Sequence, residues 1–153
     1  MPARLVGNNH VNLTVSDLAA STEWYCRVLG LTVVSNHSNI GPPYFTDVTY
    51  NGLFDLTTMS YVVGLIQHPD GVAGRFDERR VGLDHFGLQV PERADLDDWV
   101  RRLDEHGVAH SGIVSAPYAT VVNFRDPDGI ALELSVMDSG FWVSLVRDVA
   151  LRS

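Results

Sequence analysis

Two histidines occupy the same place in two copies of one sequence pattern. The stretch that begins at His10 (HVNLTV) returns at His85 (HFGLQV), and in each copy a tryptophan follows fourteen residues later, at Trp24 and Trp99. A duplicated half must bury its apolar face against its own copy, so we expect a cleft shared by the two halves. Both imidazoles should open equivalent strands and face that cleft.

A carboxylate near the end of the second copy completes a metal-binding set. Along the strand predicted for 130–136, Leu132 and Leu134 share one side while Glu133 lies on the other, which should face the cleft. A carboxylate buried there needs a partner, and a metal held by His10 and His85 would be that partner. Two imidazoles and one carboxylate are typical of an open metal site. The alternatives are an exposed edge-strand glutamate or an ion pair to an arginine such as Arg125.

The first copy offers no equivalent carboxylate. Aligning the two copies places Gly64 opposite Glu133, and glycine has no side chain with which to bind a metal. Three protein ligands with open positions for water and substrate suit a Lewis-acid or oxygen-activating centre. Gln67 has the opposite strand parity to Gly64. His68 has the same parity but lies about 13 Å further along an extended strand, so we expect it at the cleft mouth.

Two further side chains are candidates for a catalytic role beside His68. His110 begins a strand of the second copy and could face the cleft, and Tyr118 precedes the final hairpin, where it could hydrogen-bond a substrate. His106 ends a predicted helix, where a cationic side chain favours the helix dipole, so we interpret it as structural. His37 is expected in a loop.

Length and composition restrict the class of protein. The chain has 153 residues, 45% of them apolar, and a net charge of −8. This length suits one well-buried domain, and the negative charge argues against a nucleic-acid partner. The single cysteine, Cys26, excludes an internal disulfide, and we find neither a leader segment nor an apolar run long enough to span a membrane. We therefore expect a cytoplasmic protein that binds a small molecule.

Periodicity predicts an α+β fold made of two βαβββ modules. The modules cover 7–68 and 83–137, with a polar connector at 69–82 and a C-terminal amphipathic helix at 139–151. Together they should form a single domain in which curved mixed sheets enclose the cleft. We expect a helix that begins at residue 18 and is stopped by Gly30, and a second that is capped by Asp95 and stopped by Gly107. The expected strands are 11–15, 31–35, 45–50, 61–67, 83–90, 108–114, 120–124 and 130–136. The apolar stripe of the last helix needs a surface to pack on, which favours a homodimer.

The chain resembles the vicinal oxygen chelate superfamily, which includes glyoxalase I, bleomycin-resistance proteins, fosfomycin-resistance enzymes and extradiol dioxygenases. The resemblance rests on the paired modules, on the histidine that opens each, and on the ending DPDGIALEL from Asp126. It implies a divalent metal (Fe2+, Mn2+, Ni2+, Co2+ or Zn2+) that chelates two neighbouring oxygens of a small substrate. The family's ligands carry over onto His10, His85 and Glu133.

The resemblance also ranks the activities. Glyoxalase I has a fourth ligand in its first module, where this chain has Gly64, so a typical glyoxalase I is not expected. A His/His/Glu set is closer to the dioxygenases and the resistance enzymes, which favours a dioxygenase or a lyase or isomerase. The alternative is a non-catalytic, bleomycin-resistance-like protein that sequesters a drug or metabolite in the same cleft; such members lack the metal.

Overall fold

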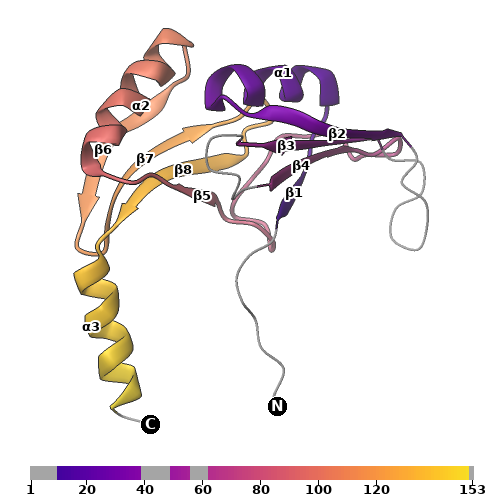
Figure 1. Ribbon diagram of the computed structural model, residues 1–153. Helices are drawn as coiled ribbons and strands as arrows, with labels where there is room; N and C mark the ends of the chain where they lie inside the picture. Colours follow the sequence, from indigo (N-terminus) through magenta and orange to yellow (C-terminus); the bar gives the residue numbers. More distant parts are fainter. Residues whose placement is uncertain (1–9, 39–48, 56–61, 152–153) are drawn as a thin grey trace. The chain divides into compact units, whose positions relative to one another are not determined.

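The chain repeats one topology in two compact units, Met1–Gly74 and Arg75–Ser153 (Figure 1). A computed structural model describes residues 10–38, 49–55 and 62–151. Each unit holds a four-stranded mixed sheet, with the order β1-β4-β3-β2 in the first and β5-β8-β7-β6 in the second. In both, the first strand pairs in parallel with the last and the other pairs are antiparallel. The βαβββ repeat, the α+β class and the mixed sheets are confirmed. The boundary between the two units, after Gly74, falls inside the predicted connector.

The first unit consists of one helix and four strands. Its elements are β1 (Val11–Thr14), α1 (Leu18–Leu29), β2 (Thr32–Ser38), β3 (Thr49–Phe54) and β4 (Val62–Gln67). Helix α1 begins where the side chain of Asp17 accepts a hydrogen bond from the Ala20 amide, and it ends at Gly30, whose φ of 73° is left-handed. Its buried residues Tyr25 and Val28 pack over the sheet.

The second unit repeats this order and adds a terminal helix. Its elements are β5 (Phe86–Gln89), α2 (Arg93–Glu105), β6 (His110–Ala116), β7 (Ala119–Arg125), β8 (Ala131–Met137) and α3 (Ser139–Ala150). The turn between β7 and β8 is closed by a 3.0 Å hydrogen bond from the Gly129 amide to the Asp126 carbonyl, and Gly129 has a φ of 84°. The sequence Asp-Pro-Asp-Gly therefore forms the predicted turn, which aligns β8 against β7.

Several element boundaries differ from the sequence-based prediction. Strand β2 continues to Ser38 because it pairs with β3, although a loop was expected from residue 36. Strand β3 runs to Phe54 rather than ending at 50, and most of the earlier stretch predicted as strand lies outside the described residues. Helix α2 begins at a capping box in which Glu92 and Asp95 bond each other's backbone amides, so Asp95 is its third residue and not its cap.

Helix α3 has the predicted extent, and none of its residues is buried. Asp138 caps it by accepting a 2.7 Å hydrogen bond from the Phe141 amide. Seven large apolar side chains remain exposed: Phe141, Trp142, Val143, Leu145, Val146, Val149 and Leu151. The homodimer that would cover them stays a prediction, as does the joining of the two modules in one domain.

Candidate functional site

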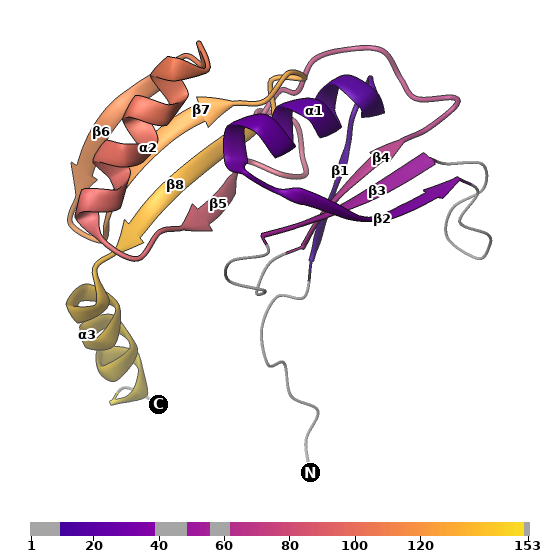
Figure 2. The ribbon, with the colours of Figure 1, turned by 45° about the horizontal axis from the view of Figure 1, so that its top comes forward.

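The sheet of the second unit has one apolar face and one polar face. Phe86, Leu132 and Phe124 stand side by side in register and are buried on the face that α2 covers (Figure 2). The alternate positions point to the opposite face, where Gly87, Glu133 and Asn123 form a row across three strands. Glu133 therefore lies on the side of β8 that the alternation predicted.

His85 directly precedes β5, the parallel neighbour of the strand that holds Glu133. Gly87 is the register partner of Glu133, and a Cβ added at Gly87 would lie 4.0 Å from the Oε1 of Glu133. The Glu133 carboxylate thus leans across the surface of β5. His85 precedes Gly87 by two residues, so the alternation of the extended chain turns its imidazole to the same face. Because Gly87 has no side chain, the surface of β5 beside the carboxylate is open.

The His85 ring is held by its neighbour in the chain. Its Nδ1 lies 2.7 Å from the Oδ1 of Asp84, and both side chains are accessible to solvent. A carboxylate accepts and does not donate, so Nδ1 carries the proton of this bond. In the neutral ring the lone pair is then on Nε2, which is the arrangement in which a histidine binds a metal through Nε2.

The first unit repeats this arrangement without the carboxylate. Asn12 is in register with Gly64, as Gly87 is with Glu133, so the strand pairing itself puts Gly64 in the place of Glu133. His10 precedes Asn12 by two residues and is exposed. The alternation puts it on the face opposite Leu13 and Leu65, which are buried. The alignment of the two copies is therefore correct at this position.

Gln67 and His68 lie at the other end of β4 from His10. Gln67 joins the sheet to the start of α1: its Oε1 accepts a 3.1 Å hydrogen bond from the Leu18 amide, and its Nε2 donates at 2.9 Å to the Ser16 carbonyl. His68 follows directly, half-buried. Since His10 would stand beside residue 62 in the register, His68 is roughly 20 Å further along the strand. The structure does not bring His68 to His10.

His110 lies on the helix-covered face of the second sheet, away from Glu133. It pairs with Phe124 across β6 and β7, and Phe124 pairs with Leu132. Its Nδ1 accepts a 3.0 Å hydrogen bond from the Gly112 amide, and its Nε2 lies 3.1 Å from the Asp104 carboxylate on α2. Both ring nitrogens are therefore in contact with neighbouring groups, one on α2 and one on β6. A catalytic role for His110 stays a prediction.

Tyr118 lies at the tip of the β6–β7 hairpin, beside the start of α3. Its carbonyl accepts a 2.9 Å hydrogen bond from the Asp138 amide, and its ring is 6.2 Å from that of Phe141. Asp138 follows Glu133 by five residues, just past the end of β8, which is about 17 Å of extended chain. The structure therefore places Tyr118 apart from Glu133 and next to α3. Its role as a substrate contact stays a prediction.

Two side chains lie beside Glu133, and only Arg125 was named from the sequence. Asn123 is the direct partner of Glu133 on β7, and Arg125 is the diagonal neighbour on the same face, about 7–8 Å away between Cα atoms. Counting outward from the Asp-Pro-Asp-Gly turn would have found Asn123 as well. Asn123 can offer an amide to a ligand held at Glu133.

Arg125 fixes the connector against the turn that leads into β8. Its guanidinium binds the carboxylate of Glu78 in bidentate fashion, at 2.7 and 3.0 Å, and also donates to the Gly129 carbonyl at 2.9 Å. The hydrogen bonds from Arg125 lower the pKa of Glu78 to about 2. Arg125 therefore pairs with Glu78 and not with Glu133.

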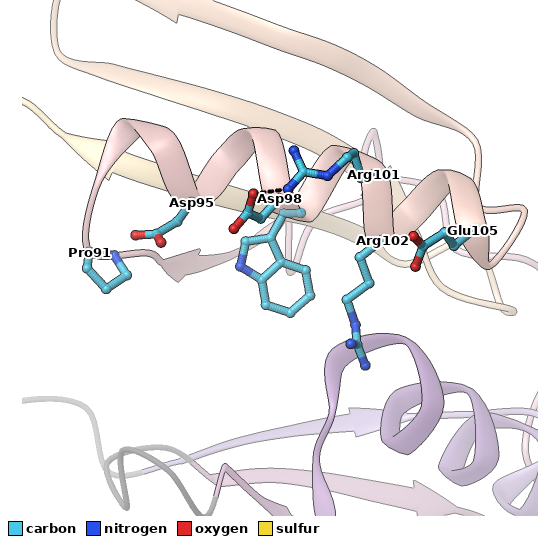
Figure 3. A pocket seen from close by; sticks show the side chains of 7 residues that line it. Pro91, Asp95, Asp98, Arg101, Arg102 and Glu105 are labelled. Carbon is cyan, nitrogen blue, oxygen red and sulfur yellow. Dashed lines mark hydrogen bonds and ion pairs between the residues drawn. The ribbon is translucent and has the colours of Figure 1, made fainter.

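A hollow of about 410 Å³ lies along α2 and is lined by none of the predicted site residues (Figure 3). Trp99 stands in it beside Asp98 and Arg101, which form an ion pair, and the Arg102 guanidinium lies 5.8 Å from the indole ring centre. Because α2 covers the face opposite Glu133, this hollow is a feature of the outer helix surface. Its carboxylates, Asp95, Asp98 and Glu105, do not form a group that could hold a metal ion.

The donor set decides how well a metal fits. Glu133 offers a carboxylate on β8, His85 an imidazole just before the neighbouring β5, and His10 precedes the equivalent strand of the first unit. Over residues 10–38, 49–55 and 62–151, no three His, Cys, Asp or Glu side chains form a ready group for a metal ion. The chemistry of the donors still fits a divalent metal, because an imidazole and a carboxylate on neighbouring strands are usual ligands for one. None of the described helices has the length and apolar character needed to cross a membrane.

Comparison with known proteins supports this interpretation at the level of family and fold. Residues 7–134 match the Glyoxalase/Bleomycin resistance protein/Dioxygenase superfamily. The uncharacterized protein YaeR of Escherichia coli is 30% identical over 82% of this chain and 92% of its own. The catechol-2,3-dioxygenase of Bacillus subtilis is 29% identical over 82% of this chain, which spans only 39% of the dioxygenase.

Solved structures share the fold. A glyoxylase/bleomycin resistance protein/dioxygenase domain from Frankia matches 88% of this chain and 100% of its own, with a TM-score of 0.76 and 31% identity. The fosfomycin resistance protein FosX from Listeria monocytogenes, in complex with Mn(II) and a dihydroxypropylphosphonic acid, matches 92% of this chain and 99% of its own with a TM-score of 0.66. At 15% identity it supports the fold alone. The chain therefore has the vicinal oxygen chelate fold and belongs to the Glyoxalase/Bleomycin resistance protein/Dioxygenase superfamily.

Proposed function

We propose that the protein is a metal-dependent enzyme that acts on a small, oxygen-rich organic molecule, with His10, His85 and Glu133 as the ligands of one divalent metal. The observation that carries this proposal is the register of β5 and β8, in which Glu133 stands beside Gly87, two residues after His85. The similarity to the catechol-2,3-dioxygenase favours a dioxygenase, and the proposed His/His/Glu set also suits a resistance-type enzyme. The single cysteine favours a cytoplasmic location.

Each residue of the proposed site would contribute a distinct property to the reaction. A divalent metal bound there would supply Lewis-acid stabilisation of charge on two neighbouring substrate oxygens or, as Fe(II), would make dioxygen chemistry possible. Glu133 contributes one negative charge, and Gly64 leaves the equivalent position of the first unit without a ligand. Asn123, opposite Glu133, is placed to hydrogen-bond a substrate oxygen and orient it.

Metal binding by the purified full-length chain tests the proposal. We expect about one Mn(II) or Fe(II) per chain, measured by elemental analysis and by titration followed by electron paramagnetic resonance. Loss of a residue that hydrogen-bonds to a metal ligand typically weakens metal binding about 10- to 100-fold. His85→Ala and Glu133→Gln remove proposed ligands themselves, so each should weaken binding by more than that. His106→Gln is the matched control, because His106 is the C-cap of α2 and is not a proposed ligand.

The result also separates the proposal from its alternative. If the wild type binds none of Fe, Mn, Ni, Co or Zn, and none of them raises its thermal stability, the metalloenzyme is refuted. A protein that sequesters a drug or metabolite without metal would then be the better description.

A further inference from the structure

We infer that Asp84 is a positioning residue that holds the His85 imidazole in the tautomer and orientation needed to bind a metal through Nε2. The inference rests on the proposed function, because it concerns one of the three proposed ligands. The direct evidence is the 2.7 Å contact between the Asp84 Oδ1 and the His85 Nδ1. This distance is that of a short, charge-assisted hydrogen bond.

The contact matters because about half of the His85 side chain is open to solvent. The His85 side chain is 49% exposed, so packing alone does not fix its ring. A neutral histidine can carry its proton on either nitrogen, and only the form with Nδ1 protonated leaves Nε2 as the ligand atom. The Asp84 carboxylate selects that form by accepting the Nδ1 proton in a hydrogen bond. Carboxylate partners of this kind orient metal-binding histidines and make them more basic ligands.

The space around the ring favours the same orientation. With Nδ1 bound to Asp84, Nε2 is at the opposite side of the ring. Gly87 then leaves room beside the Glu133 carboxylate, since even a Cβ there would lie 4.0 Å from the Oε1. A bulky side chain at this place on β5 would stand between His85 and Glu133. Asp84 therefore orients the imidazole, and Gly87 keeps the surface beside the carboxylate open.

The two modules differ at this position. The residue before His85 is an aspartate, whereas the residue before His10 is Asn9. An amide is a weaker acceptor than a carboxylate, because charge-assisted hydrogen bonds are roughly twice as strong as neutral ones. The second module, which also supplies Glu133, therefore has a carboxylate before its histidine where the first module has an amide.

Three variants of the full-length chain test the inference by Mn(II) affinity. Asp84→Ala removes the acceptor and should weaken Mn(II) binding about 10- to 100-fold. Asp84→Asn keeps an oxygen acceptor without the charge, so it should recover part of the loss. Asp148→Ala removes one negative charge from α3 and should bind Mn(II) as the wild type does, which controls for a general effect of charge. Far-UV circular dichroism checks that each variant is folded.

A second measurement does not depend on metal. Nitrogen-15 NMR of the metal-free protein should show the Nδ1 of His85 protonated in the wild type, with Asp84→Ala shifting the proton toward Nε2. If the wild type binds none of Fe, Mn, Ni, Co or Zn, the proposed function fails, and the tautomer of His85 alone decides the role of Asp84. A wild-type ring without a proton on Nδ1, or an Asp84→Ala variant whose tautomer and Mn(II) affinity both match the wild type, would overturn the inference.

Discussion

Replacing Gln67 by alanine should lower the free energy of unfolding by about 2 kcal/mol while leaving metal binding unchanged. The side chain makes two hydrogen bonds that join the end of β4 to the start of α1, one from the Leu18 amide and one to the Ser16 carbonyl. Leu18 is only 7% exposed, so its amide would lose its partner without good access to water. A hydrogen bond contributes about 0.5–1.5 kcal/mol net, and an unsatisfied buried donor costs about 1–3 kcal/mol.

The expected shift is measurable in two ways. For a protein of this size about 2 kcal/mol corresponds to a fall in Tm of about 4–8 °C. Chemical denaturation should show a lower midpoint with an unchanged m-value, because the surface exposed on unfolding is the same. Gln67→Glu keeps the acceptor for the Leu18 amide but loses the donor to Ser16, so its loss of stability should be smaller.

Gln89 provides a matched control. It is an exposed glutamine at the end of β5, and Gln89→Ala should change stability by no more than about 0.5 kcal/mol. A Gln67→Ala variant as stable as the wild type would refute the capping role. A variant that kept its stability and lost affinity for Mn(II) would instead make Gln67 a metal ligand.

Three further predictions concern charge, activity and assembly. The low pKa of Glu78, about 2 against a usual 4.5, means that the charged carboxylate is favoured in the fold. The ion pair of Glu78 stabilises the fold above about pH 4.5, and this stabilisation is lost as the pH falls toward 2. The difference in Tm between wild type and Glu78→Gln should therefore shrink from about pH 7 to pH 3. An equal difference at both pH values would contradict the assignment. Turnover of the hemithioacetal of methylglyoxal and glutathione should be negligible, because Gly64 offers no carboxylate as a base; robust turnover would show that another group acts as one. Light scattering should find a dimer for the intact chain and a monomer after truncation at Ser139, because α3 exposes its apolar side chains. A monomeric wild type would exclude the dimer. A truncated chain that remains dimeric would show that the interface does not involve α3.

The sequence alone determined the repeat and the residues that correspond within it. Alternation of apolar and polar residues put Glu133 on the face away from Leu132, and the alignment of the copies put Gly64 in its place; strand register confirms both. These features are predictable because strand alternation and turn chemistry are local properties of the chain. The Asp-Pro-Asp-Gly turn and the stop at Gly30 were read correctly for the same reason.

Only the tertiary structure decided which polar side chains meet. Gln67 reaches the amide of Leu18, 49 residues away, and Arg125 reaches Glu78, 47 residues away. His110 turned to Asp104 on α2 because the pairing of β6 with β7 puts it on the helix-covered face. Such partners depend on how strands pair and on which face a helix covers. These are long-range choices that no local pattern contains, since a shift of one residue in register moves every side chain to the other face.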